Sequence, residues 1–126
     1  MRNLSPRIIA PLILATAAVP VVAGGRDVPA ATPTGAAVDC ISTVGVRSQV
    51  RSDQVIDFTA GRKVYRNTLP DACPSLGFEQ RFGYRVSTTR LCSTDIITVL
   101  QGPGIQSGPS CGLGKFQPVA IVKAAR

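Results

Sequence analysis

The sequence predicts an all-β protein: a small antiparallel sheet of five to six strands that forms a partly closed, OB-like barrel or a compact sandwich, stapled by disulfides. From residue 44 onward, short runs of alternating apolar and polar residues are separated by turn signals, and no stretch keeps a helical period. The chain also holds 4 cysteines and no histidine. Because so small a domain has a limited core, we expect the cysteines to supply much of its stability.

Residues 1–23 are predicted to be a signal peptide. The basic segment MRNLSPR is followed by the apolar run IIAPLILATAAV, which is the layout of a secretory signal. An uncleaved membrane anchor is the alternative, but it needs about 20 apolar residues, and residues 8–23 are fewer and contain Pro11 and Pro20. We therefore expect a periplasmic or secreted protein with no transmembrane span. The small residues after which a signal peptidase could cut are Ala17, Ala18 and Ala23.

Residues 24–39, GGRDVPAATPTGAAVD, are predicted to form a flexible linker. The segment consists mainly of Gly, Ala, Pro, Val and Thr, and it lacks the aromatic residues and apolar periodicity that offset the entropy cost of ordering. We therefore expect a single small β domain over residues 40–126.

The mature chain is moderately basic. Loss of Arg2 and Arg7 with the signal peptide leaves 12 basic and 7 acidic side chains, a net charge of +5. Such a charge can attract a protein to anionic lipid, polysaccharide or nucleic acid, but it also serves plain solubility, which is the simpler interpretation.

Three strands are expected to follow one another as a meander. Alternation predicts strands over residues 44–50 and 54–60, with a tight turn between them. A hairpin loop at 60–62 then leads to a strand over 63–69. The residues expected on the core face of the first two strands are Val44, Val46, Val50, Ile56 and Phe58.

The second half of the domain mixes loops and strands. LPDACPSLG, residues 69–77, is expected to be a loop or one irregular helical turn pinned by Cys73. RFGYRVS, 81–87, alternates as a strand, and DIITVL, 95–100, is apolar enough for a central strand buried on much of both faces. QGPGIQSGPS is expected to be loop, and the tail after Phe116 a sixth, edge strand.

The cysteines are predicted to form two disulfides. An even number of cysteines in a short exported chain is typical of a disulfide framework, and the spacing leaves all three connectivities open. Zinc ligands usually come as close C-x2-C pairs, and a thiol oxidoreductase needs C-x-x-C; neither pattern is present. The four residues are Cys40, Cys73, Cys92 and Cys111.

The stretch GPSCGLGKF, residues 108–116, contains parts of two catalytic patterns. Ser110 fits G-x-S-x-G, but without histidine no Ser-His-Asp or Cys-His set can form within the chain. A phosphate-binding loop ending at Lys115 would need Gly and Ser or Thr where Pro109 and Phe116 stand. We expect neither activity.

The strongest candidate surface for an anionic partner combines arginines with a tyrosine. Guanidinium groups pair with phosphates, and exposed aromatic rings stack on bases in proteins that bind single-stranded nucleic acid. The alternative is a solvated sheet face with Tyr84 in the core. Export argues against a specific nucleic-acid partner. The candidate residues are Tyr65, Arg66, Arg81, Arg85 and Arg90.

Asp57 is the one acidic residue expected in the middle of a strand, and pairing with Arg66 across the predicted hairpin would explain its place. The other aspartates lie at turns or strand starts, where carboxylates commonly accept backbone N–H bonds. A carboxylate-based hydrolase using Asp57 and Asp95 is an alternative that sequence spacing cannot test. No calcium-loop pattern is present, and we expect no metal site.

The segments CISTVGVRSQV, KVYRNTLPDACPSL, FGYRVSTTRLCSTDIITVL and SCGLGKFQPV together resemble a family of small exported proteins of proteobacteria such as sphingomonads, a domain of unknown function. The resemblance covers about residues 40–119. It implies a bacterial envelope protein with structural cysteines, and it brings no activity and no catalytic residue.

These observations lead to three hypotheses of function. The first is a non-enzymatic binding or structural module without a cofactor, whose partner is an envelope protein or glycan. The second is a polyanion-binding module that uses the arginines named above, and the third is the carboxylate-based hydrolase. The oligomeric state stays open.

Overall fold

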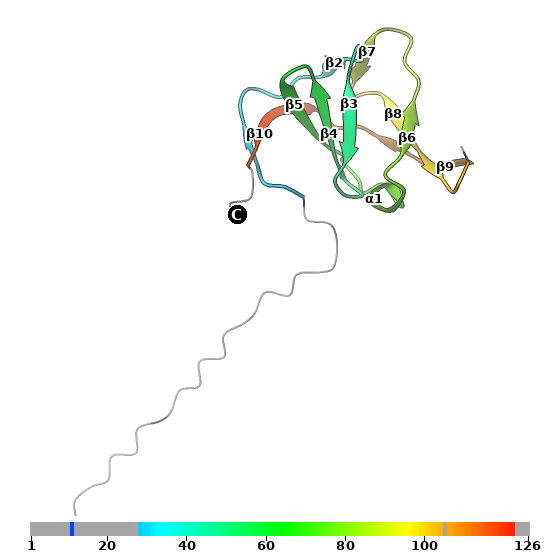
Figure 1. The fold of residues 1–126 in the computed structure, drawn as a ribbon, viewed down its shortest axis with the longest axis horizontal. Helices are drawn as coiled ribbons and strands as arrows, with labels where there is room; N and C mark the ends of the chain where they lie inside the picture. The colour runs from blue at the N-terminus through cyan, green and yellow to red at the C-terminus, as the bar shows by residue number, and fades with distance from the viewer. Residues whose placement is uncertain (1–10, 12–27, 105, 123–126) are drawn as a thin grey trace, which may run out of the picture.

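The computed structural model describes residues 11, 28–104 and 106–122, so the predicted signal peptide lies outside the described residues except at position 11. The described part is mostly antiparallel β-structure with one short helix, which confirms the all-β class (Figure 1). No helix in this part has the length and apolar character needed to cross a bilayer. The elements are β1 (Ala31–Pro33), β2 (Cys40–Ser42), β3 (Arg47–Val50), β4 (Val55–Ala60), β5 (Lys63–Thr68), α1 (Leu76–Glu79), β6 (Phe82–Tyr84), β7 (Arg90–Cys92), β8 (Ile96–Gln101), β9 (Gln106–Gly112) and β10 (Phe116–Ile121).

The largest sheet has five strands in the order β1-β10-β5-β4-β3. The predicted meander forms its β3-β4-β5 part, and Ala60 pairs with Lys63 across a two-residue loop. The loop begins with Gly61 at φ 62°, a left-handed conformation that glycine adopts without strain. The strand prediction for this half of the domain is therefore confirmed.

The structure differs from the prediction at both ends of the folded part: in the segment expected to be a flexible linker and in the place of the last strand. Residues 31–33, predicted to belong to a flexible linker, form β1 and pair with β10, and Thr34 N–H donates to Pro118 O at 2.9 Å. Strand β10, expected at the edge, therefore lies between β1 and β5. Sequence composition missed β1 because an edge strand can be short and contain proline when only one side of it must pair.

A second sheet has three strands in the order β6-β8-β9. Strand β8 is central, as predicted, with Ile97 and Val99 fully buried, but its other face is more open, with Ile96 59% exposed. The segment predicted as loop before Ser110 instead forms most of β9. The β8–β9 register shifts between Thr98 and Leu100 of β8. This irregularity accommodates Gly108 and Pro109 within β9.

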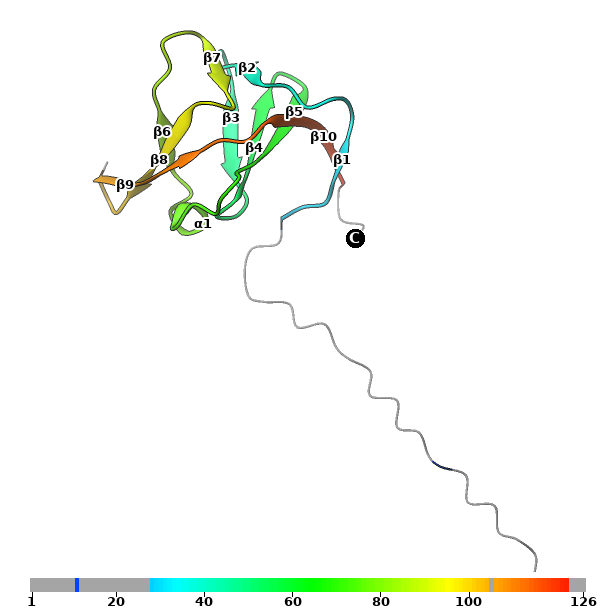
Figure 2. The ribbon, with the colours of Figure 1, turned by 180° about the vertical axis from the view of Figure 1, so that it is seen from behind.

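The remaining strands, β2 and β7, pair as a separate two-stranded sheet at the end of the molecule opposite α1 (Figures 1 and 2). The described strands thus form three sheets rather than the single curled sheet expected, and no closed barrel is found among them.

The hydrophobic core lies between the inner faces of the two larger sheets. Phe58 on β4 meets Phe116 on β10 and Phe82 on β6 edge-on, with ring centroids 5.4 and 6.1 Å apart. Val46 and Val50 face this core as predicted, but Val44 is 73% exposed because the turn at Thr43–Val46 carries it outward. The fully buried large side chains are Ile56, Phe58, Leu69, Leu76, Leu91, Ile97, Val99 and Phe116.

The segment 69–77, expected to be a loop or one irregular helical turn, is loop up to Ser75, and helix α1 begins at Leu76 and extends past the predicted segment to Glu79. Its start is fixed by the buried Cys73, whose N–H donates to Asp53 O at 2.7 Å, and by Leu76, which points into the core. Left-handed residues at Ser75 and Gln80 limit the helix to one turn.

Candidate anion-binding site

The most concentrated group of charges in the described part lies on the outer face of the five-stranded sheet, where Asp57 pairs with two arginines. Asp57 on β4 stands directly opposite Arg66 on β5, whose Nε–H and Nη2–H groups donate to the two carboxylate oxygens at 2.8 and 3.0 Å. Arg51 adds a third bond, from its Nε–H to Oδ2 at 2.8 Å. The predicted Asp57–Arg66 pair is confirmed, and it belongs to a larger cluster.

This cluster keeps the Asp57 carboxyl ionised. Burial alone would raise the pKa of Asp57, but the hydrogen bonds and charges of Arg66 and Arg51 outweigh it and lower the pKa below its ordinary value of 3.8. Since both oxygens already accept bonds from the arginines, the carboxylate has neither a proton to donate nor a strong tendency to take one. Its role is to hold the two guanidinium groups in place.

A groove of about 280 Å³ opens above this cluster; we call it the Asp57 groove. Its lining comes from β3, β4, β5 and the end of β10, together with Arg51 just after β3. The residues around it are Arg47, Ser48, Gln49, Arg51, Asp57, Thr59, Val64 and Ile121.

The five residues predicted to bind an anion do not gather on one surface. Arg66 is largely buried by its bonds to Asp57 and by donation from Nη1 to the Pro29 carbonyl at 2.7 Å. Tyr65 faces the opposite side of the same strand and packs against the core. Arg81 donates to the carbonyls of Gly102 and Gly104 at the β8–β9 turn.

The other two arginines lie elsewhere again. Arg85 lines a second, shallow groove of about 670 Å³ on the face of β8 that carries Ile96 and Thr98. Arg90 is exposed on β7. Tyr84 packs against the core, as the solvated-face interpretation expected.

The two carboxylates considered for a hydrolase line different grooves. Asp57 belongs to the Asp57 groove, and Asp95 to the groove beside β8. Asp95 also accepts the Cys92 N–H at 2.6 Å, and Asp53 accepts the N–H of the distant Gly77 at 2.8 Å, so both carboxylates accept backbone N–H bonds, as predicted for turn aspartates.

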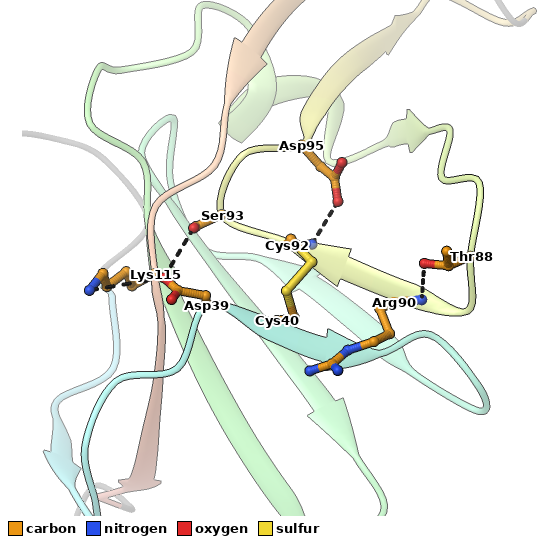
Figure 3. The surroundings of a disulfide bond; sticks show 8 residues. All are labelled: Asp39, Cys40, Thr88, Arg90, Cys92, Ser93, Asp95 and Lys115. Carbon is orange, nitrogen blue, oxygen red and sulfur yellow. Dashed lines mark hydrogen bonds and ion pairs between the residues drawn. A yellow bond between two sulfur atoms is a disulfide. The ribbon is translucent and has the colours of Figure 1, made fainter.

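The predicted disulfides are confirmed, and the structure selects one connectivity: Cys40–Cys92 and Cys73–Cys111. Cys40 and Cys92 are directly opposite partners on β2 and β7, with Asp39, Arg90 and Asp95 close by (Figure 3). Cys73–Cys111 ties the loop before α1 to β9. Two bridges indicate folding in an oxidising, extracytoplasmic environment.

Sequence reasoning missed Arg47 and Arg51 as site residues. The signal was present, since the alternation of the first strand places Arg47 and Gln49 on the polar face, and Arg51 follows with the same spacing of two. What could not be read from spacing is that β3 pairs with β4 in the register that sets Gln49 opposite Asp57. Among the described residues, no cluster of three or more His, Cys, Asp or Glu side chains could hold a metal ion.

Comparison of the chain with protein-family models, with curated proteins and with solved structures found no match.

Proposed function

We propose that the chain is an exported, non-enzymatic binding module of the bacterial envelope. The observation that carries the proposal is the pair of disulfides, which cross-link residues 52 and 38 positions apart in a domain of small core. Such cross-links form and persist in the periplasm or outside the cell. The apolar run of residues 8–23 would direct the chain there, and the resemblance to exported sphingomonad proteins stays a prediction in the same direction.

The chemistry of the acidic residues supports a binding rather than a catalytic role. Asp57 is held ionised by two arginines, and Asp53 and Asp95 are bonded to backbone N–H groups. A glycosidase needs two carboxyl groups facing one substrate, and Asp57 and Asp95 line different grooves. We also propose that the domain is an open, sandwich-like structure, because the two larger sheets share one hydrophobic core.

Polyanion binding is the second candidate function, but the structure favours other arginines than those considered from the sequence. A basic net charge supports it, but the arginines first considered are dispersed, whereas Arg47 and Arg51 line one groove together with Asp57, which Arg66 also contacts. The binding surface of the module is therefore proposed to be the Asp57 groove rather than the strand face that carries Arg81 and Arg85.

Cell fractionation tests the proposal. The full chain, expressed in a Gram-negative host, should appear in the periplasmic fraction with an N-terminus generated after Ala17, Ala18 or Ala23. A variant with Leu12→Arg and Leu14→Arg, which breaks the apolar run, should stay in the cytoplasm and serves as the control. Retention of the unaltered chain in the cytoplasm with Met1 in place would contradict it.

A further inference from the structure

The Asp57 groove carries more positive charge than its carboxylate neutralises. Among the described residues, Arg47 and Arg51 line the groove and Arg66 is bonded to Asp57 on the same face of the sheet, so three guanidinium groups accompany one carboxylate, an excess of two positive charges. A buried aspartate needs only one bidentate arginine to be satisfied, and Arg66 provides it. The two guanidinium groups on this carboxylate repel each other, and an anion bound beside them would offset that repulsion.

Arg51 presents unused donors to the groove. Its Nε–H is bonded to Asp57, while its two terminal amino groups donate to no other described residue. Every buried side-chain nitrogen and oxygen in the described part has a hydrogen-bond partner, so these amino groups must be open to solvent. The Arg51 guanidinium is thus oriented on one side and free on the other.

Neighbouring side chains complete a polar lining. Arg47, two positions earlier on β3, is exposed and forms no ion pair with a described residue. Gln49 lies between the two arginines in sequence and on the same face, and Thr59 stands opposite Arg47 on β4. The amide and hydroxyl can donate hydrogen bonds to an oxyanion without adding charge.

We propose that the Asp57 groove binds a phosphomonoester group through Arg47 and Arg51, with Asp57 and Arg66 as positioning residues. This inference rests on the proposed function, whose ligand class it names. A phosphomonoester carries about −1.5 to −2 charges at pH 7, which matches the excess of two positive charges. Planar guanidinium donors suit phosphate oxygens, and a groove of about 280 Å³ accommodates one such group rather than a long polymer.

Titration with inorganic phosphate, followed by two-dimensional nitrogen–proton NMR at constant ionic strength, tests the proposal. The expected result is saturable shifts confined to the amides of residues 47–51 and 57–59 and to the Nε–H signal of Arg51. Shifts spread over distant arginines such as Arg62 and Arg90, or a linear response without saturation, would overturn it, because both indicate general charge screening.

Matched variants separate a built site from net charge. Arg51→Gln should weaken phosphate binding roughly tenfold, the effect of losing one charge-assisted contact. Arg47→Gln should weaken it roughly threefold or more, and because Arg47 is exposed and outside the ion cluster, this variant tests the site without risk to the fold. Arg90→Gln removes the same charge from β7 and should leave binding unchanged; equal losses in Arg47→Gln and Arg90→Gln would overturn the site.

Two further probes identify the source of the phosphate. Glycerol 3-phosphate represents a soluble ligand, and vesicles of phosphatidylcholine containing phosphatidic acid represent a lipid headgroup. Binding of either that is weakened by Arg47→Gln supports the site, and binding of neither overturns it. If phosphate does not bind at the Asp57 groove, the proposed export still stands on the fractionation result. If the chain stays in the cytoplasm but binds phosphate there, the proposed function is wrong and the phosphate site stands.

Discussion

Asp57 and Arg66 face each other across the β4–β5 hairpin and are joined by two hydrogen bonds of 2.8 and 3.0 Å, with Asp57 only 2% exposed. This pair fixes the outer face of the five-stranded sheet, because Arg66 also reaches the Pro29 carbonyl and so connects β5 to the segment before β1. Asp57 thus orients the arginine that links this hairpin to Pro29, 37 positions earlier in the chain.

Asp57→Asn should destabilise the fold by about 3 kcal/mol, because removing one partner of a buried ion pair leaves the other charge uncompensated. Here two arginines lose their shared acceptor. Urea unfolding followed by circular dichroism measures the change. Asp71→Asn, at an exposed position, is the matched control and should stay within about 0.5 kcal/mol of the parent. Equal stabilities of the two variants would show that the cluster contributes nothing.

The free energy of unfolding should decrease at acid pH because Asp57 becomes protonated. Because the pKa of Asp57 is lowered in the folded state, the folded chain binds fewer protons than the unfolded chain. The stabilisation is therefore fully present above about pH 4 and is lost as pH falls through the folded pKa. Unfolding free energies measured between neutral and acid pH should show a smaller acid loss in Asp57→Asn than in the parent chain. An identical loss in both would place the acid sensitivity elsewhere.

The two disulfides should differ in how easily they are reduced. In the Cys73–Cys111 bridge, Cys73 is fully buried and only Cys111 is partly accessible, whereas Cys40 and Cys92 are both partly accessible. Thiol–disulfide exchange requires access to a sulfur atom, so limited reduction followed by alkylation should label Cys40 and Cys92 first. Labelling of Cys73 and Cys111 ahead of them would contradict the burial that the structure shows.

Each disulfide should contribute about 4 kcal/mol to stability in the chain-entropy model, given sequence separations of 52 and 38. Paired Cys→Ala variants that remove one bridge at a time measure this by chemical unfolding. Removal of Cys73–Cys111 should cost more, since it also leaves a cavity in the core at Cys73. A loss under about 1 kcal/mol for either pair would show that the bridges are not needed for stability.

Gly114→Ala should be strongly destabilising, whereas Gly112→Ala should be tolerated. A Cβ at Gly114 would overlap the carbonyl oxygen of Thr68, while one at Gly112 would meet no atom within 4 Å. Gly114 also exchanges two hydrogen bonds with the buried Asn67 side chain, at 2.7 and 2.8 Å, and these would be disturbed. We expect a loss of about 2 kcal/mol or more for Gly114→Ala in thermal unfolding. Similar melting temperatures for the two variants would contradict the close contact.

The sequence was most informative where local pattern and structure coincide. Alternation with β-branched and aromatic residues identified β3 to β5 and the central β8, and the odd mid-strand place of Asp57 pointed to its partner Arg66. Strands β1 and β9 were missed because each contains a proline and neither shows apolar alternation, and their ordering comes from pairing with β10 and β8, which is a long-range effect.

The candidate site was less accessible to sequence reasoning than the fold. The arginines were grouped because they are close in sequence. In the structure, Arg66 lies on the outer face of the five-stranded sheet, Arg81 donates to a carbonyl at the β8–β9 turn, and Arg90 lies on a separate sheet. The grouping of Arg47 and Arg51 with Asp57 depends on the β3–β4 register, which spacing alone does not fix.

The most direct test of the central claim, an exported domain stapled by two disulfides, is peptide mapping of the protein recovered from the cell envelope under non-reducing conditions. Trypsin alone leaves Cys92 and Cys111 on one peptide because no Lys or Arg lies between them, so a second protease that cuts before Asp95 is needed. We predict a mature chain four hydrogens lighter than its reduced form, with linked peptides that pair Cys40 with Cys92 and Cys73 with Cys111. Free thiols, or another pairing, would contradict the account.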